Sequence, residues 1–302
     1  MAITSIDGIV AAAAAGHQYK TTWTKQVHPT YAPYTAGRWY DTSQLFGLPT
    51  AETFAGTALT AVQCVGPGTP SVCPGCMQTG GTVEPTYNKY LASIEVNSYA
   101  ATNITFGWLL LVDMLMYYPG INMDSNLMQI LTTNVSLPRY TDGHGVQMYL
   151  VSMGTTGATA SNIHPYGFDY TSNLGTAGRV IPGTVALTAS SLPAQIIHSG
   201  VAVNNVGPFL PLEASDDGVQ SVQTVQFTAA TGTAVTATLV LCRPIAQIPI
   251  ATYLVPSGRD FLFSMPIFPR IYDGAYLNFL YLPGGATAAS NDLYAVLDFV
   301  WG

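Results

Sequence analysis

Apolar and β-branched residues recur along the chain in short runs that are separated by turn residues. Such runs are typical of β-strands. The intervening sequences, such as GPGTP at 66–70 and TDGHG at 141–145, are rich in turn residues. The expected strands are Tyr90–Val96, Thr105–Tyr118, Val146–Ser152, Thr184–Leu187, Val222–Phe227, Ala234–Leu241, Tyr276–Leu282 and Tyr294–Trp301. The pattern predicts an all-β chain, which would fold as a sandwich, jelly roll or barrel.

The best helical pattern lies at Ile6–Ala15, an alanine-rich stretch for which Ser5 and Asp7 are cap candidates. Asp7 stands where a secretion signal would carry a cation, so we expect a short N-terminal helix and folding in a cytoplasm. The longest apolar run, Phe106–Tyr118, is too short to span a bilayer and is interrupted by Asp113. It is expected to be a buried strand, and no membrane is implied.

Three pairs of similar segments indicate an internal duplication. The paired segments are PRYTDG at 138–143 with PRIYDG at 269–274, TAGR at 35–38 with TAGR at 176–179, and LASIEVN at 91–97 with VQSVQTV at 219–225. They occur in the same order in both halves, which predicts two tandem β-sandwich or jelly-roll units, 1–155 and 156–302. The arginine of each Pro-Arg-x-x-Asp-Gly motif is expected to pair with a carboxylate or with backbone carbonyls.

The first unit is longer than the second between TAGR and the aligned serine, in the segment that contains SVCPGCMQTGG. We interpret this segment as an insertion in an exposed loop of the first unit. Cys64, Cys73 and Cys76 lie in it, and three readings stay open. The cysteines are weak candidates for a zinc knuckle that lacks a fourth ligand, they staple the loop by a disulfide, or they are free thiols. No cofactor is expected, and Cys242 is expected to be a buried thiol.

The chain contains unusually few charged residues. Only 8% of the residues are charged, against about 25% in ordinary globular proteins, and the formal net charge is −7. The chain has no basic cluster, so direct binding to nucleic acid is not expected. A chain with so few charges has little to keep its copies apart, which favours a protein that is packed against neighbours. An ordinary secreted β protein is the alternative.

No catalytic motif stands out. The four glutamates, Glu52, Glu84, Glu95 and Glu213, form no recognisable pair, and no nucleophile elbow, phosphate-binding loop or zinc-protease motif is present. Asp142 and His144 are interpreted as part of a solvated turn. The chain is therefore expected not to be an enzyme.

Three aromatic residues beside turn sequences are candidates for contacts between subunits. They are Trp39 and Tyr40 in GRWYD and Trp301 in the terminal LDFVWG. Tyrosine and tryptophan are enriched at subunit interfaces, and at loop tips they also stack on sugar rings. With so little charge, we favour the interface role.

The segments IDGIVAAAAAGHQYKTTWTKQ, TAGRWYDTSQLFGLP, VSLPRYTDGHGVQMYLV and LDFVWG together resemble virion structural proteins of tailed bacteriophages. The resemblance extends over most of the chain and implies a non-enzymatic head decoration (cement) or minor capsid protein. It implies a location in the virion, assembly in the host cytoplasm, and contacts with other capsid proteins. We expect a homo-oligomer, with a trimer as the first hypothesis. The alternatives are a receptor- or carbohydrate-binding module of a tail or fibre, a double-jelly-roll capsid subunit, and an enzyme on a β scaffold.

Overall fold

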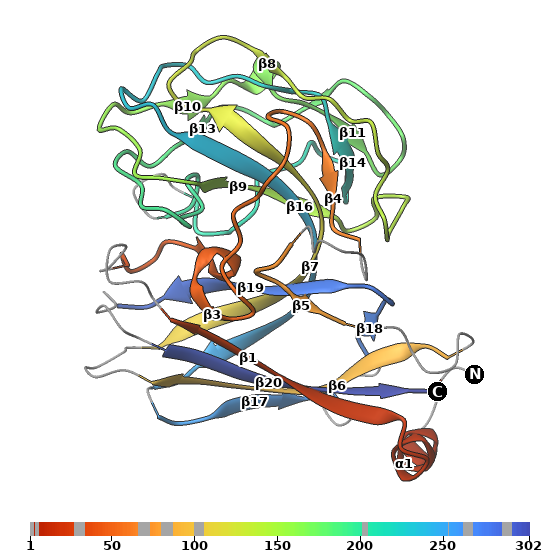
Figure 1. Ribbon diagram of the computed structural model, residues 1–302. Coiled ribbons are helices and arrows are strands. Elements are labelled where there is room, and N and C mark those ends of the chain that lie inside the picture. Colours follow the sequence, from red (N-terminus) through yellow and green to blue (C-terminus); the bar gives the residue numbers. More distant parts are fainter. Residues whose placement is uncertain are drawn as a thin grey trace.

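The computed structural model describes residue 3 and residues 6–26, 34–65, 73–79, 87–99, 106–200, 205–252, 254–261, 268–285 and 292–302. The fold is all-β, as predicted, with a short N-terminal helix, α1 (Ile6–Ala14). Figure 1 shows a lower sandwich, which contains the labelled C-terminus and α1, and an upper sandwich above it.

The lower sandwich consists of two antiparallel sheets that face each other. The first sheet has the strand order β17–β6–β20–β1–β3, with β18 added on β6. Its strands are β1 (Gln18–Gln26), β3 (Phe46–Leu48), β6 (Lys89–Tyr99), β17 (Ser257–Asp260), β18 (Arg270–Ile271) and β20 (Asp292–Trp301). Trp23 of β1 and Phe279 of the second sheet meet in the buried core between these sheets, with ring centroids 4.7 Å apart.

The second sheet extends from the lower sandwich into the upper one. Its strand order is β2–β19–β7–β16–β9, with β4 on β7 and β5 on β19. Its strands are β2 (Tyr40–Asp41), β4 (Val62–Gln63), β5 (Met77–Gln78), β7 (Gly107–Asn122), β9 (Gln147–Ser152), β16 (Thr236–Ile250) and β19 (Tyr276–Pro283). The two longest strands, β7 and β16, pair with each other and run through both sandwiches (Figure 1).

A bulge at Leu115 lets one strand serve both sandwiches. Met116 pairs with Leu241 and Met114 pairs with Cys242, so Leu115 is the extra residue of β7. Below the bulge, Leu109 and Leu111 face the lower core, whereas beyond it Met116 and Tyr118 face the upper core. A bulge inserts one residue into the alternation and so exchanges the two faces of a strand.

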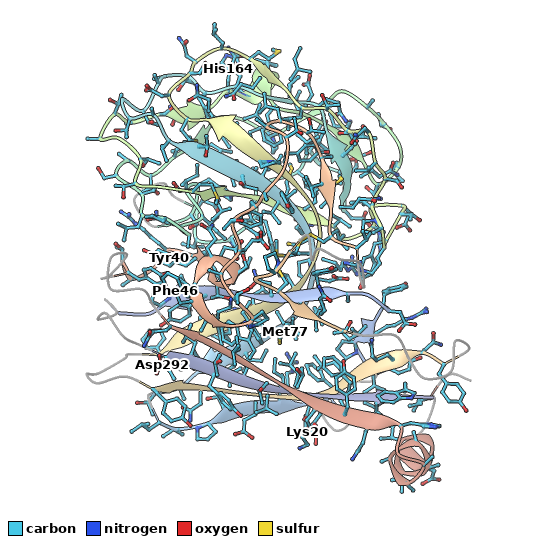
Figure 2. The ribbon with its side chains drawn as sticks, in the orientation of Figure 1. Lys20, Tyr40, Phe46, Met77, His164 and Asp292 are labelled. Carbon is cyan, nitrogen blue, oxygen red and sulfur yellow. A yellow bond between two sulfur atoms is a disulfide. The ribbon has the colours of Figure 1, made fainter. Side chains whose placement is uncertain are left out.

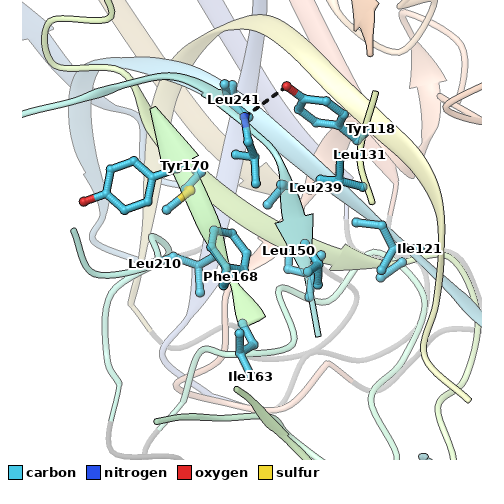
Figure 3. Close-up of a cluster of buried hydrophobic side chains, with 14 of the residues drawn as sticks. Tyr118, Ile121, Leu131, Leu150, Ile163, Phe168, Tyr170, Leu210, Leu239 and Leu241 are labelled. Atoms are coloured by element: carbon cyan, nitrogen blue, oxygen red, sulfur yellow. Dashed lines mark hydrogen bonds between the residues drawn. The ribbon is translucent and has the colours of Figure 1, made fainter. Parts of the chain in front are cut away.

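The upper sandwich packs small sheets and connecting segments over the upper ends of β7, β16 and β9. Its core contains Tyr118, Phe168, Tyr170 and many aliphatic side chains (Figure 3). The Tyr118 hydroxyl accepts a hydrogen bond of 3.1 Å from the Val222 amide, which satisfies a polar group inside this core. Its elements are β8 (Gln129–Ile130), β10 (Asn162–Ile163), β11 (Asp169–Ser172), β12 (Arg179–Val180), β13 (Val185–Ala186), β14 (Val219–Val222), β15 (Thr224–Val225) and the short 3-10 helix η3 (Pro165–Gly167).

Every strand that the apolar pattern predicts contains a strand in the structure. β16 continues nine residues past the predicted end at Leu241, through Pro244 and Pro249. Beyond Cys242, β16 has lost β9 as a partner, so two residues without an amide hydrogen are tolerated there. The division into 1–155 and 156–302 stays a prediction. Both large sheets combine strands from the two ranges, since β6 pairs with β20 and β7 pairs with β16.

Candidate functional site

The three clustered cysteines lie in the interior, on the face of the second sheet opposite the lower core. Cys64 and Cys73 form a disulfide, and Cys76 is a buried free cysteine. Residues 66–72, which the disulfide closes into a loop, lie outside the described residues. All three cysteines are at most 3% exposed, so this part of the predicted insertion is packed inside rather than protruding. Cys242 is also a buried free cysteine, as expected.

The surroundings of Cys76 keep its sulfur in the thiol form. Burial, with the nearby carboxylates Glu52 and Asp41, raises the pKa of Cys76 well above its usual value. Its sulfur lies 3.1 Å from that of Met114. Within the described part of the chain, no group of three His, Cys, Asp or Glu side chains is placed to hold a metal ion. The disulfide removes two of the three thiols from any such site.

A buried ion pair lies beside the disulfide and joins three segments of the chain. Arg139 donates two hydrogen bonds to Asp113, of 2.8 and 2.7 Å, and one of 2.9 Å to the Cys64 carbonyl. It also donates to the carbonyls of Met114 and Gly274, at 2.9 and 3.0 Å. Residue Arg139 is 7% exposed and Asp113 is 1% exposed. The arginine of the first motif thus pairs with both a carboxylate and carbonyls, as predicted, so the charge of Asp113 is paired in the interior.

The two Pro-Arg-x-x-Asp-Gly motifs meet in space. Gly274, which accepts from Arg139, belongs to the second motif, and the rings of Tyr140 and Tyr272 pack edge to face with centroids 4.8 Å apart. The second arginine, Arg270, makes no corresponding ion pair with any described residue, so the predicted pairing is seen only for the first motif. It is exposed and lies over the Tyr272 ring, 4.5 Å from its centroid.

The three predicted interface aromatics are covered by the chain itself. Trp39 is 4% exposed, and its indole donates to the Val206 carbonyl at 2.9 Å. Tyr40 is fully buried and stacks on Tyr34 with centroids 3.8 Å apart. Trp301 is 7% exposed and stacks on His17. A role for these residues between subunits stays a prediction, and inside the chain Trp39 and Tyr40 belong to hydrophobic cores.

Large apolar side chains that are exposed gather instead at one end of the lower sandwich, which we name the apolar end. Strand pairing brings these segments together, because Gln26 of β1 lies opposite both Phe46 and Asp292, and Asp292 lies opposite Tyr99. Figure 2 shows Phe46 and Asp292 at this end, at the left of the view. The apolar end comprises Phe46, Leu48, Tyr99, Phe106, Trp108, Leu254 and Val255, which are 37–69% exposed.

A buried lysine holds part of the apolar end in place. The Lys25 ammonium group lies within hydrogen-bond distance of four backbone carbonyls, which share its three N–H donors, and Pro49 at 2.7 Å and Leu45 at 3.1 Å are the nearest. Burial lowers the pKa of Lys25 to about 8, so the ammonium remains charged at neutral pH. These bonds fix the turn from which β3 presents Leu48, whose side chain is 69% exposed. No sequence pattern indicates this role, because the carbonyl partners lie about twenty residues away.

Three of the other residues considered as candidates, Glu52, His144 and Glu213, have structural partners. Glu52 accepts from the amides of Thr53, Phe54 and Gly75 and so fastens the cysteine segment. The side chain of His144 is 63% exposed and lies 2.7 Å from Asp217. Glu213 pairs with Arg179, and Glu84 lies outside the described residues.

No described helix is long and apolar enough to cross a membrane. The chain matches no family model and no curated protein. Solved structures with some likeness include the VP2 subviral particle of infectious bursal disease virus, at 8% identity over 94% of this chain and 80% of that chain, with a TM-score of 0.19. The Gx strain of the same virus gives 9% identity over 93% and 80%, with a TM-score of 0.19. At TM-scores this low, the likeness carries no conclusion about fold or role.

Proposed function

We propose that this chain is a non-enzymatic structural protein of a virus particle, and that it acts through contacts between subunits. The observation that carries the proposal is the apolar end. On a chain with 8% charged residues, seven large apolar side chains are concentrated at one end of a sandwich. Exposed apolar groups gathered in this way mark surfaces for protein contacts. The resemblance of several segments to phage virion proteins supports the particle as the setting.

Within that class, we propose a capsid decoration or cement protein in which copies, with a trimer as the first hypothesis, stabilise the head. Repeated weak contacts gain strength when symmetry holds many of them at once. A subunit of a double-jelly-roll shell would use the same surface. Cryo-electron microscopy of particles that contain the chain separates these roles, because a decoration protein lies on a lattice formed by another protein.

Self-association of the purified chain tests the contact surface. The variant Leu48→Asp places a charge in the apolar end, and light scattering after gel filtration gives the mass of the assembly. We expect the wild-type chain to be oligomeric and the variant to shift toward the monomer. Leu174→Asp is the matched control, because Leu174 is similarly exposed, at 72%, in the upper sandwich. A monomeric wild-type chain that also fails to bind capsid lattices would overturn the proposal.

A second candidate is carbohydrate binding at the top of the upper sandwich. Tyr166 of η3 is 77% exposed, and Gln226, which packs against neighbouring Gly167, donates to the Asn126 carbonyl. An exposed ring beside amide groups is suited to stacking on a sugar. Glycan-array binding that disappears in Tyr166→Ala would favour this function, whereas a blank array would exclude the sugars displayed.

A further inference from the structure

A polar pocket of about 300 Å³ lies at the end of the lower sandwich opposite the apolar end, where the two Pro-Arg-x-x-Asp-Gly motifs meet. It is beside the start of β6 and beside β18, near the labelled C-terminus in Figure 1. Its cationic side chains are Lys89, Arg139 and Arg270, and Asp273 is its carboxylate. Tyr87, Asn88, Pro138, Ile271 and Tyr272 complete the lining.

The concentration of positive charge in this pocket is unusual for the chain. The whole sequence has nine lysines and arginines and a net charge of −7, and three of those nine cations line this pocket. Two of the three are neutralised within the fold. Arg139 pairs with Asp113, and Lys89 lies 3.5 Å from Asp273. Arg270 therefore supplies the surplus positive charge.

Arg270 is held in place while its donors stay available. Its guanidinium lies 4.5 Å from the centroid of the Tyr272 ring, and that ring packs in turn against Tyr140. A stacking contact uses the face of the guanidinium and leaves its N–H groups in the plane. Among the described residues, none accepts a hydrogen bond from the Arg270 side chain. A planar fork of donors with no acceptor is suited to bind an oxyanion.

We infer that this pocket binds an oxyanion, a carboxylate or phosphate group, with Arg270 as the direct ligand. Lys89 and Arg139 line the same space, but each has a carboxylate partner, so the binding charge comes from Arg270. The site is distinct from the apolar end and does not depend on self-association. The pocket exceeds the size of one oxyanion, so the group would be carried by a larger molecule.

Isothermal titration calorimetry with inorganic phosphate and, separately, with malonate tests the site and distinguishes the two oxyanions. Saturable binding is expected for at least one of them, and Arg270→Gln should weaken it by about tenfold or more. Arg259→Gln is the matched control, because Arg259 also lies over an aromatic ring, that of Phe261, but outside the pocket. The affinity of the Arg259→Gln variant for phosphate and malonate should stay within about twofold of that of the wild type.

For Asp273→Asn we expect tighter binding of the oxyanion, a change that damage to the fold would not produce. Asp273 is the one carboxylate among the described lining residues, so its removal should tighten binding and increase the dependence of binding on salt. Phosphate also stabilises proteins by exclusion from their surface, so a rise in melting temperature alone is no support. Absence of saturable binding of both oxyanions, or equal loss in the Arg270 and Arg259 variants, would overturn the inference.

Discussion

The two Pro-Arg-x-x-Asp-Gly motifs have the same residues at four positions, yet their arginines have opposite environments. Arg139 is 7% exposed, and its guanidinium donates to a carboxylate and three backbone carbonyls. Arg270 is exposed and rests on the Tyr272 ring. The difference comes from Asp113, a carboxylate in the middle of the apolar strand β7, which has to be paired. A repeated motif therefore fixes the turn, whereas the neighbouring strand decides the role of its arginine.

The largest expected effect is the loss of the buried arginine. Arg139→Met leaves the buried Asp113 carboxyl group without its cation, and we expect it to lower the free energy of unfolding by about 3–5 kcal/mol. Urea denaturation measures the change. The double variant Asp113→Leu/Arg139→Met is the control, because it removes both charges and should be less destabilised. If the double variant is as unstable as the single one, the ion pair is not the reason for the loss.

The disulfide bears on the same comparison, because the Cys64 carbonyl accepts from Arg139, whereas no described carbonyl accepts from the Arg270 side chain. In the variant Cys64→Ala/Cys73→Ala the loop between these two residues, which are nine positions apart, is no longer closed. We expect the free energy of unfolding to fall by about 2–3 kcal/mol. Thiol titration in denaturant without reductant should find two reactive thiols in the oxidised wild-type chain, from Cys76 and Cys242. Four reactive thiols would contradict the assigned disulfide.

The ring contact between Tyr140 and Tyr272, which joins the two motifs, should contribute to the free energy of unfolding. A double-mutant cycle with Tyr140→Leu and Tyr272→Leu should give a coupling of about 0.5–1.5 kcal/mol, the usual value for an edge-to-face aromatic pair. Thermal denaturation of the four proteins provides the data. Tyr99 and Tyr294 form a second edge-to-face pair, with centroids 6.5 Å apart, and serve as the reference cycle. Additive effects at Tyr140 and Tyr272 would mean that the motifs are adjacent without being coupled.

The smallest effect on stability is expected at the second arginine. Arg270→Gln removes an exposed side chain, so the free energy of unfolding should change by no more than about 0.5 kcal/mol. The same urea titration as for Arg139 measures it, which places both motif arginines on one scale. A loss as large as that of Arg139→Met would show that Arg270 has a structural partner and would remove the contrast.

The sequence predicted the strands whose interiors are apolar, and it missed β1. The residues of β1, QYKTTWTKQ, are mostly polar, and only Trp23 and Lys25 are buried, so an apolar pattern cannot reveal this strand. The cysteine spacing allowed several pairings, and only the fold brings Cys64 to Cys73. The apolar end was equally invisible, since its residues are distant in sequence and meet only through strand register.

The shared strands of the second sheet have a mechanical consequence. From the pair Gly107 and Ile250 to the pair Asn122 and Thr236, β7 and β16 form one antiparallel ribbon through both sandwiches. Their hydrogen bonds lie perpendicular to the strands, so a force along the ribbon loads many of them together in shear rather than one after another. The ribbon therefore connects the two sandwiches without a hinge, and we expect it to resist a pull between the base and the top of the molecule.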